Sequence, residues 1–156
     1  MQKSVISWTN ATWNAISGCS RLSDGCKFCY AATLSQKYGW TTKDWTLQNE
    51  GENVRIKPHK LHEPYLLKEP TRIFVNSMSD MFHRVIPDWY RAAMFCVMLD
   101  LPQHTFQVLT KRSLETVDWH ERFVTAVQTP EFAAFREQVK DKRVKAALGK
   151  AWASPW

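Results

Sequence analysis

The chain has 156 residues, of which 44% are hydrophobic, and this is enough to bury one ordinary core, so a disordered polymer is excluded. The 21 Lys and Arg residues outnumber the 15 Asp and Glu residues, which gives a formal net charge of +6. This charge permits a nucleic acid or another anionic partner but does not require one, because a merely soluble basic domain has the same composition.

The first residues, MQKSVISWTNATW, contain no long apolar run, so we expect no secretory signal. No apolar segment reaches the length that spans a membrane, and we expect no membrane partner. The protein is therefore expected in the cytoplasm, where clustered cysteines bind metals or do chemistry more often than they form disulfides.

The first half of the chain predicts a strand, a loop, a helix and a long irregular segment. Residues 4–17 alternate between apolar and polar types, as in a strand or extended segment, and lead into a turn-rich loop over 18–25. Residues 29–38 have helical character, and Gly39 would end that helix. Residues 41–70 are polar and interrupted by prolines, which is typical of a loop-rich insertion.

The second half alternates strands and helices. The stretch TRIFVNSMSD, residues 71–80, contains a continuous apolar run that predicts a strand buried on both faces. Residues 87–101 form an apolar helical pattern, and residues 104–112, HTFQVLTKR, predict a third strand. Residues 129–150 predict a helix that becomes basic toward its C-terminal half.

This alternation predicts an α/β fold made of parallel βα units, in a single domain over residues 1–156. The cysteine loop, NSMSD and TKR each follow a predicted strand, so they should converge at the carboxyl edge of the sheet, where such folds do their chemistry. Three βα units do not close a barrel of eight. We therefore expect the N-terminal fragment of a longer barrel; the alternative is a natural end with a small sheet.

Three of the four cysteines lie within GCSRLSDGCKFCYA, with the spacing C-x6-C-x2-C: Cys19, Cys26 and Cys29. One interpretation is a structural zinc site, which usually has four ligands. The fourth ligand would have to come from elsewhere in the chain: His59, His62 or Cys96. Cys96 falls on an apolar helix face, where a buried and inert thiol is the simpler interpretation.

The other interpretation is an iron–sulfur cluster held by three thiolates, with one iron left open. Such an iron can bind the amine and carboxylate of S-adenosylmethionine (SAM), whose reductive cleavage generates a radical. Phe28 stands directly before the last cysteine and would lie against the cofactor, or it would simply pack the loop onto the core.

Three stretches resemble, in order, an uncharacterised phage and prophage family, the gene-product thirty-seven/sixty-eight family: WTNATWNAISGCSRLSDGCKFCYA, FVNSMSDMF and PQHTFQVLTKR. That family is similar to radical SAM proteins, which have a partial or full (β/α) barrel and a [4Fe–4S] cluster on three cysteines. The resemblance implies cluster ligation by Cys19, Cys26 and Cys29, binding of SAM, an electron donor as partner, and a phage or prophage protein in a bacterial host.

The sequence departs from these patterns at several points. The usual radical SAM spacing is C-x3-C-x2-C, and here the first gap is longer. The family commonly has proline where Ala15 stands and cysteine where Asn76 stands. Its members usually continue beyond LTKR into another strand, which supports the expectation of a fragment.

The resemblance extends the site by position. Ser77, Ser79 and Asp80 follow the second strand, where radical SAM proteins tend to hold the SAM amino group, and Asp80 is the expected amine acceptor. Lys111 and Arg112 end the third strand and would hold a carboxylate or phosphate. Turn and helix capping is the alternative for the first three residues, and a solvated surface pair for the other two.

Three functions remain open at this stage. The first is a radical SAM-like enzyme whose substrate class is a nucleotide or nucleic acid, with His83 as a proton donor or an ordinary loop histidine. The second is a binding module in which a structural zinc site places a basic, aromatic surface on nucleic acid. The third is a truncated remnant without catalytic activity.

Overall fold

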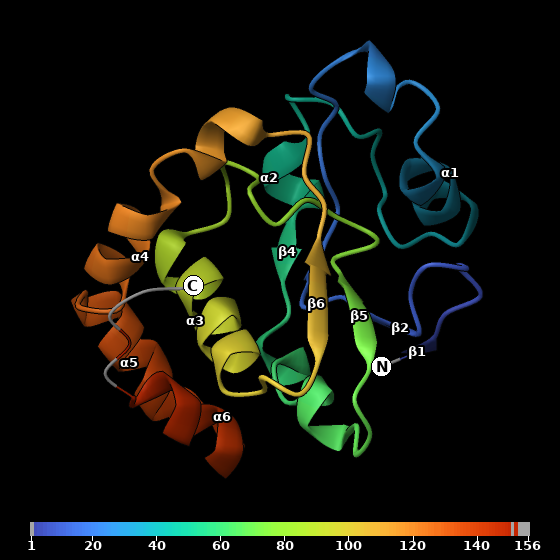
Figure 1. Cartoon of the computed structure of the whole chain (residues 1–156). Helices are drawn as coiled ribbons and strands as arrows, with labels where there is room; N and C mark the ends of the chain where they lie inside the picture. Colours follow the sequence, from blue (N-terminus) through green and yellow to red (C-terminus); the bar gives the residue numbers. More distant parts are fainter. Residues whose placement is uncertain (1, 151, 153–156) are drawn as a thin grey trace.

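The computed structural model describes residues 2–150 and Trp152, which form a mixed α/β structure (Figure 1). Its main sheet has four strands in the order β1-β2-β5-β6. Their bounds are Gln2–Lys3, Ala11–Trp13, Arg72–Val75 and Thr105–Val108. The strands β2, β5 and β6 are parallel, and β1 runs antiparallel to β2. The predicted α/β fold with a parallel sheet is confirmed, and the described strands form an open sheet rather than a closed barrel.

The central strand β5 follows from its apolar run. It pairs with β2 on one side, where Ile73 lies opposite Ala11, and with β6 on the other, where Ile73 lies opposite Phe106. Ile73 and Val75 are both fully buried. A strand with neighbours on both sides and apolar residues on both faces belongs at the centre of a sheet.

The described residues form six α-helices: α1 (Tyr30–Lys37), α2 (Glu50–Asn53), α3 (Asp88–Leu99), α4 (Trp119–Ala126), α5 (Pro130–Gln138) and α6 (Lys142–Leu148). Figure 1 shows α3 between the strands and the three C-terminal helices, with α1 on the far side of the strands from these helices. No helix in the described part of the chain is long and apolar enough to cross a membrane.

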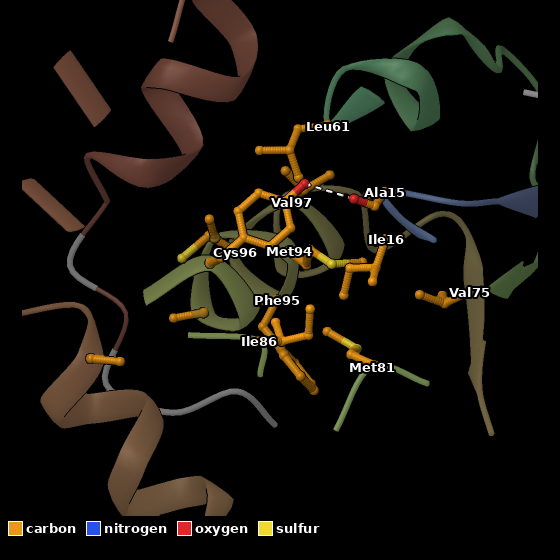
Figure 2. Close-up of a cluster of buried hydrophobic side chains, with 14 of the residues drawn as sticks. Ala15, Ile16, Leu61, Val75, Met81, Ile86, Met94, Phe95, Cys96 and Val97 are labelled. Carbon is orange, nitrogen blue, oxygen red and sulfur yellow. Dashed lines mark hydrogen bonds between the residues drawn. The ribbon is translucent and has the colours of Figure 1, made fainter. Parts of the chain in front are cut away.

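The helix α3 is the centre of the main hydrophobic core (Figure 2). Cys96 is fully buried among these apolar side chains, so the fourth cysteine is a core residue as expected. The hydroxyl of Tyr90 donates a 2.9 Å hydrogen bond to the carbonyl oxygen of Ala15. This bond fixes α3 to the segment that leads from β2 into the cysteine loop.

Residues 41–70 contain short elements joined by loops. They comprise α2, the two-residue strand β4 (Arg55–Ile56), and the 3-10 helices η2 (Pro58–Lys60) and η3 (Glu63–Leu66). The strand β4 pairs antiparallel with β3 (Ile16–Ser17), which places this segment beside the start of the cysteine loop.

The single helix predicted over 129–150 is wrong, because the chain forms α5 and α6 with a break between them. Val139 takes an extended conformation, with φ −68° and ψ 122°. The side chain of Asp141 then accepts hydrogen bonds from the backbone N–H groups of Arg143 and Val144 and begins a new helix. An aspartate in this position stabilises a helix start.

Candidate functional site

A cavity of about 620 Å³ opens at the carboxyl ends of β5 and β6; we call it the cysteine cavity. The three cysteines of the motif all line it. Five predicted cofactor-binding residues line it as well: Ser77, Ser79, Asp80, Lys111 and Arg112. The loops after three neighbouring parallel strands therefore meet at one edge of the sheet.

The cysteine loop is shaped by short local structure. Cys26 ends the 3-10 helix η1 (Asp24–Cys26), and its backbone N–H donates a 2.9 Å hydrogen bond to the carbonyl of Ser23. Cys29 stands at the N-cap position of α1, and its N–H donates to the carbonyl of Cys26 at 3.2 Å. These turns bring the second and third thiols to the same cavity wall.

Gly18 positions the first thiol. Its φ of +78° lies in the left-handed region, and a Cβ there would lie 2.0 Å from the carbonyl oxygen of Asn53. Its N–H donates a 3.1 Å hydrogen bond to the carbonyl of Met78, and Gly18 forms an isolated bridge with Ser79. Only glycine allows the loop to approach the backbone of Asn53 this closely.

The three cysteines supply the donor type that an iron–sulfur cluster needs, and they line one cavity. All three thiols are free and partly exposed. The residues considered for a fourth zinc ligand lie elsewhere: His59 and His62 line a different cavity, and Cys96 is in the core. Among the described residues, no group of three or more His, Cys, Asp or Glu side chains is arranged to hold a metal ion, so the three thiols line one cavity without forming a preformed metal site.

Positive charge lies against the thiols. Burial raises the pKa of the Cys19 thiol to about 11, and the Arg112 guanidinium, with its Nη1 3.7 Å from the Cys19 sulfur, acts in the opposite direction. Burial also acts to raise the pKa of Cys26, but backbone hydrogen bonds from Leu22 and Ser23 and the Lys111 ammonium outweigh it, so this pKa lies below its ordinary value. Both cations favour thiolates, which are the form that binds metal.

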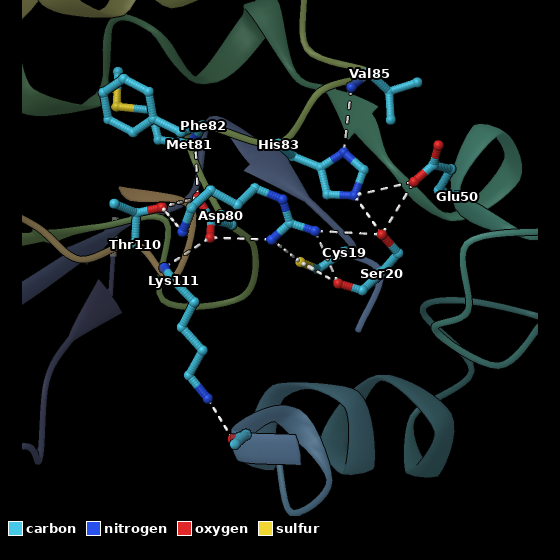
Figure 3. A network of polar contacts seen from close by, with 12 residues as sticks. Cys19, Ser20, Glu50, Asp80, Met81, Phe82, His83, Val85, Thr110 and Lys111 are labelled. Carbon is cyan, nitrogen blue, oxygen red and sulfur yellow. Dashed lines mark hydrogen bonds and ion pairs between the residues drawn. The ribbon is translucent and has the colours of Figure 1, made fainter. Parts of the chain in front are cut away.

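Asp80 holds the end of β6 to the end of β5 (Figure 3). Its Oδ1 accepts hydrogen bonds from the Phe82 N–H at 2.9 Å and from the Thr110 hydroxyl at 2.7 Å. Its Oδ2 accepts from the Lys111 N–H and from Nη1 of Arg112, both at 3.2 Å. A carboxylate has about four lone-pair positions. Asp80 accepts four hydrogen bonds from the protein itself, which leaves little capacity for a hydrogen bond from the amino group of SAM, the role expected for it.

A second network lies behind Cys19 and joins Ser20, His83 and Glu50 (Figure 3). The N–H of Val85 donates to Nδ1 of His83, so the proton of this histidine is on Nε2, which lies 2.8 Å from the Ser20 hydroxyl. That hydroxyl donates to the Glu50 carboxylate at 3.1 Å. Arg112 donates to both the carbonyl and the hydroxyl of Ser20.

His83 is fully buried, and burial together with the Arg112 charge lowers its pKa to about 4. It is not among the residues that line the cysteine cavity. The geometry makes it a positioning residue for Ser20 and the cysteine loop. Sequence analysis missed Ser20 and Glu50, because no spacing pattern connects residues 30 positions apart.

Residues 3–149 match the model of a family described as a protein of unknown function, DUF5131. The chain belongs to the DUF5131 family. No curated protein and no solved structure matches it. The matched segment of this DUF5131 protein includes all three cysteines and both polar strand ends of the cysteine cavity.

Two further positions of the DUF5131 chain bear on the site. Phe28, predicted to contact the cofactor, is 89% exposed and does not line the cysteine cavity. Asn76 lines the cavity with a φ of 58°, and its Oδ1 accepts a 3.2 Å hydrogen bond from the Ile16 N–H. The Nδ2 of Asn76 is buried with no hydrogen-bond partner among the described residues. A buried donor of this kind calls for an acceptor that a bound molecule would supply.

Proposed function

We propose that this DUF5131 protein is a radical SAM-like iron–sulfur enzyme that holds a [4Fe–4S] cluster through Cys19, Cys26 and Cys29 and binds SAM in the same cavity. One observation carries the proposal: the three thiols line a single cavity at the carboxyl edge of a parallel sheet. The resemblance of its three stretches to the phage and prophage family supports it and also supports a phage origin.

The cavity has room for a cofactor. Its volume of about 620 Å³ lies within the roughly 300–1,000 Å³ range of small-molecule sites. A cluster with one iron free of protein ligands supplies electron transfer to SAM and, through it, radical chemistry. The protein supplies the three thiolates, the enclosing walls and the charges around them.

The residues around the thiols have separate tasks in this proposal. Arg112 offsets the negative charge at Cys19, and Asp80 holds that guanidinium in place. Lys111 donates a hydrogen bond to the carbonyl of Gly25 and so connects the end of β6 to the cysteine loop. Asn76 offers its unused N–H₂ group to an acceptor atom of the bound cofactor.

The substrate class in this proposal is a nucleotide or nucleic acid. The net charge of +6 supports it, because a basic protein attracts polyphosphate partners. The electron donor would be a separate protein or a small-molecule reductant.

The test is metal content after anaerobic purification and reconstitution, with iron, sulfide and zinc measured and the visible absorbance recorded. We expect about four irons and four sulfides per chain. Replacement of any of Cys19, Cys26 or Cys29 by Ala should remove the cluster. The matched control is Cys96→Ala, which removes a thiol from the core and should leave the iron content unchanged.

Two results would contradict the proposal. One zinc per chain in a colourless protein would support the zinc-containing binding module instead. A folded protein that retains neither metal under reconstitution would support the inactive remnant. If the cluster forms, consumption of SAM by the reduced protein is the next measurement.

A further inference from the structure

A second cavity, of about 430 Å³, lies on the other side of the wall that carries Cys19; we call it the lysine cavity. Ser17 and Gly18 line it, directly before the first cysteine. Met78 also lines it, between the two serines that face the cysteine cavity. The two cavities thus share a wall made of two short segments, joined by the hydrogen bond from Gly18 to Met78.

The lysine cavity contains a lysine that forms no direct ion pair with a described residue. Lys57 lines it, and its ammonium makes no hydrogen bond or ion pair with any residue that the structure describes. Burial and the neighbouring Lys60 lower the pKa of Lys57, and the Glu63 carboxylate only partly opposes them. Lys60 lines the same cavity and lies 3.3 Å from the Glu63 carboxylate, so the three side chains together carry one excess positive charge. A bound anion stabilises a partly buried ammonium that has no direct ion pair.

Other donors in the lysine cavity are also unused. Among the described residues, the hydroxyls of Thr12, Ser17 and Ser35 make no hydrogen bond, although all three residues line the cavity. Hydroxyl and ammonium groups are the usual protein partners of phosphate oxygens.

An aromatic surface completes the cavity. Trp40 lines it and is 61% exposed, and the ring of Tyr38 stacks on Trp40 with centroids 5.1 Å apart. Exposed stacked rings provide a surface on which a nucleobase can stack regardless of its sequence. The cavity therefore combines a site for a phosphate with a site for a base.

We propose that the lysine cavity binds a nucleotide, with its phosphate on Lys57 and Lys60 and its base on Trp40. The nucleotide is either free or part of a single strand, and both present the same phosphate and base. The helix α1 borders both cavities, with Tyr30 in the wall of the cysteine cavity and Ser35 in the wall of the lysine cavity. The role of this nucleotide as a substrate for chemistry in the cysteine cavity rests on the proposed function. The binding of the nucleotide in the lysine cavity does not.

The experiment measures binding of a fluorescein-labelled oligothymidylate of eight nucleotides by anisotropy, in the absence of SAM. Thymidine monophosphate and inorganic phosphate serve as competitors and distinguish a strand from a free nucleotide. We expect Lys57→Gln to weaken oligonucleotide binding and to reduce the slope of log affinity against log salt by about 0.7, as for one lost phosphate contact. Trp40→Ala should weaken oligonucleotide binding about tenfold, and Trp40→Phe should retain much of the wild-type affinity.

The control is Lys68→Gln, which removes the same charge from an exposed position that lines neither cavity. Equal weakening by Lys57→Gln and Lys68→Gln would overturn the proposal in favour of nonspecific attraction. Competition by inorganic phosphate as strong as that by thymidine monophosphate would overturn the contact with the base. If the protein binds none of the three probes, the proposal of a nucleotide site in the lysine cavity is wrong. Because cluster content is measured separately, this failure is distinguishable from failure of the proposed function.

Discussion

The guanidinium of Arg112 is 5% exposed and donates hydrogen bonds to Cys19, Ser20 and Asp80. Its replacement would leave the Asp80 carboxylate buried without its counter-charge. We expect Arg112→Met to lower the free energy of unfolding by about 3–5 kcal/mol, as is typical when one partner of a buried pair is removed. Urea denaturation of the apoprotein measures this loss.

A double-mutant cycle with Asp80→Asn separates the ion pair from the other contacts of each residue. Because the two side chains interact directly, the double variant should lose less stability than the sum of the two single variants. Additive losses would show that Arg112 and Asp80 stabilise the fold independently, and the description of Asp80 as the support of Arg112 would then be wrong.

Two glycines with positive φ allow a matched comparison. Gly18 has φ +78° and no room for a Cβ, whereas Gly39 has φ +64° and nothing within 4 Å of its Cβ position. Gly39→Ala should therefore cost only the strain of a left-handed alanine, about 1–2 kcal/mol. Gly18→Ala should cost clearly more, because the backbone of Asn53 must also move.

Thermal unfolding and reconstituted iron content of both variants test this difference. Gly18→Ala should also lose iron, since the displaced loop carries Cys19, while Gly39→Ala should retain it. Equal stability of the two variants would contradict the close packing of the loop against Asn53.

At the level of single residues, the sequence predicts that the site residues meet at one edge of the sheet. It does not predict the contacts among them. The three cysteines, Asp80 and Arg112 could be placed together because the ends of parallel strands share one edge of a sheet. The use of Asp80 as a support, and the burial of His83 behind Ser20, depend on contacts between residues 30 to 63 positions apart. Neither spacing nor residue type encodes such contacts.

At the level of elements, the apolar patterns of β5 and α3 predict the structure, whereas the two-residue strands and the break in the C-terminal helix are not predictable from a pattern. The apolar run of β5 specified a central strand, and the pattern of α3 specified a buried helix. The two-residue strands β3 and β4 are too short to show any periodicity, and they form only because tertiary packing brings them together.

The break between α5 and α6 shows how a single side chain can override helix propensity. The residues around it, REQVKDKRV, contain neither glycine nor proline, so the local sequence predicts one continuous helix. The break depends on Asp141, which accepts hydrogen bonds from two backbone N–H groups, and on burial of Val144 in the core.

Asp141→Ala should therefore destabilise the protein by about 1 kcal/mol, the usual effect of losing an N-cap side chain. The adjacent Lys142→Ala is the control, because Lys142 is exposed and its replacement should change stability by less than about 0.5 kcal/mol. Urea denaturation distinguishes the two. An equal effect of both variants would mean that core packing alone sets the start of α6.

At the scale of the whole molecule, Asp88 connects the first turn of α3 to α4. Its carboxylate accepts hydrogen bonds from Arg122 at 2.7 and 2.9 Å and also pairs with Arg91. Arg91 is buried and donates to the carbonyls of Met81 and Ile86, which belong to the loop after the cysteine-cavity strand β5. One acidic residue thus joins the site-bearing loop to the C-terminal helices.

This cluster should make stability depend on pH. Burial acts to raise the pKa of Asp88, but the hydrogen bond from Arg122 and the charges of Arg91 and Arg122 outweigh it and hold the pKa below its ordinary value of 3.8. A lowered pKa in the folded state means that the contribution to stability is present above the unfolded-state pKa and disappears as the pH falls through the folded-state pKa. Because the carboxylate is 36% exposed, we expect a contribution of no more than about 1 kcal/mol.

The measurement compares thermal unfolding of the wild-type chain and Asp88→Asn from about pH 7 to about pH 3. The wild-type protein should be the more stable at neutral pH, since Asn keeps the shape of the side chain but loses the ionic partner of both arginines. The difference should begin to shrink as the pH falls to the unfolded-state pKa of about 3.9 and should disappear only below the lower folded-state pKa. A difference that stays constant across this range would mean that Asp88 joins α3 to α4 through hydrogen bonds alone, with no contribution from its charge.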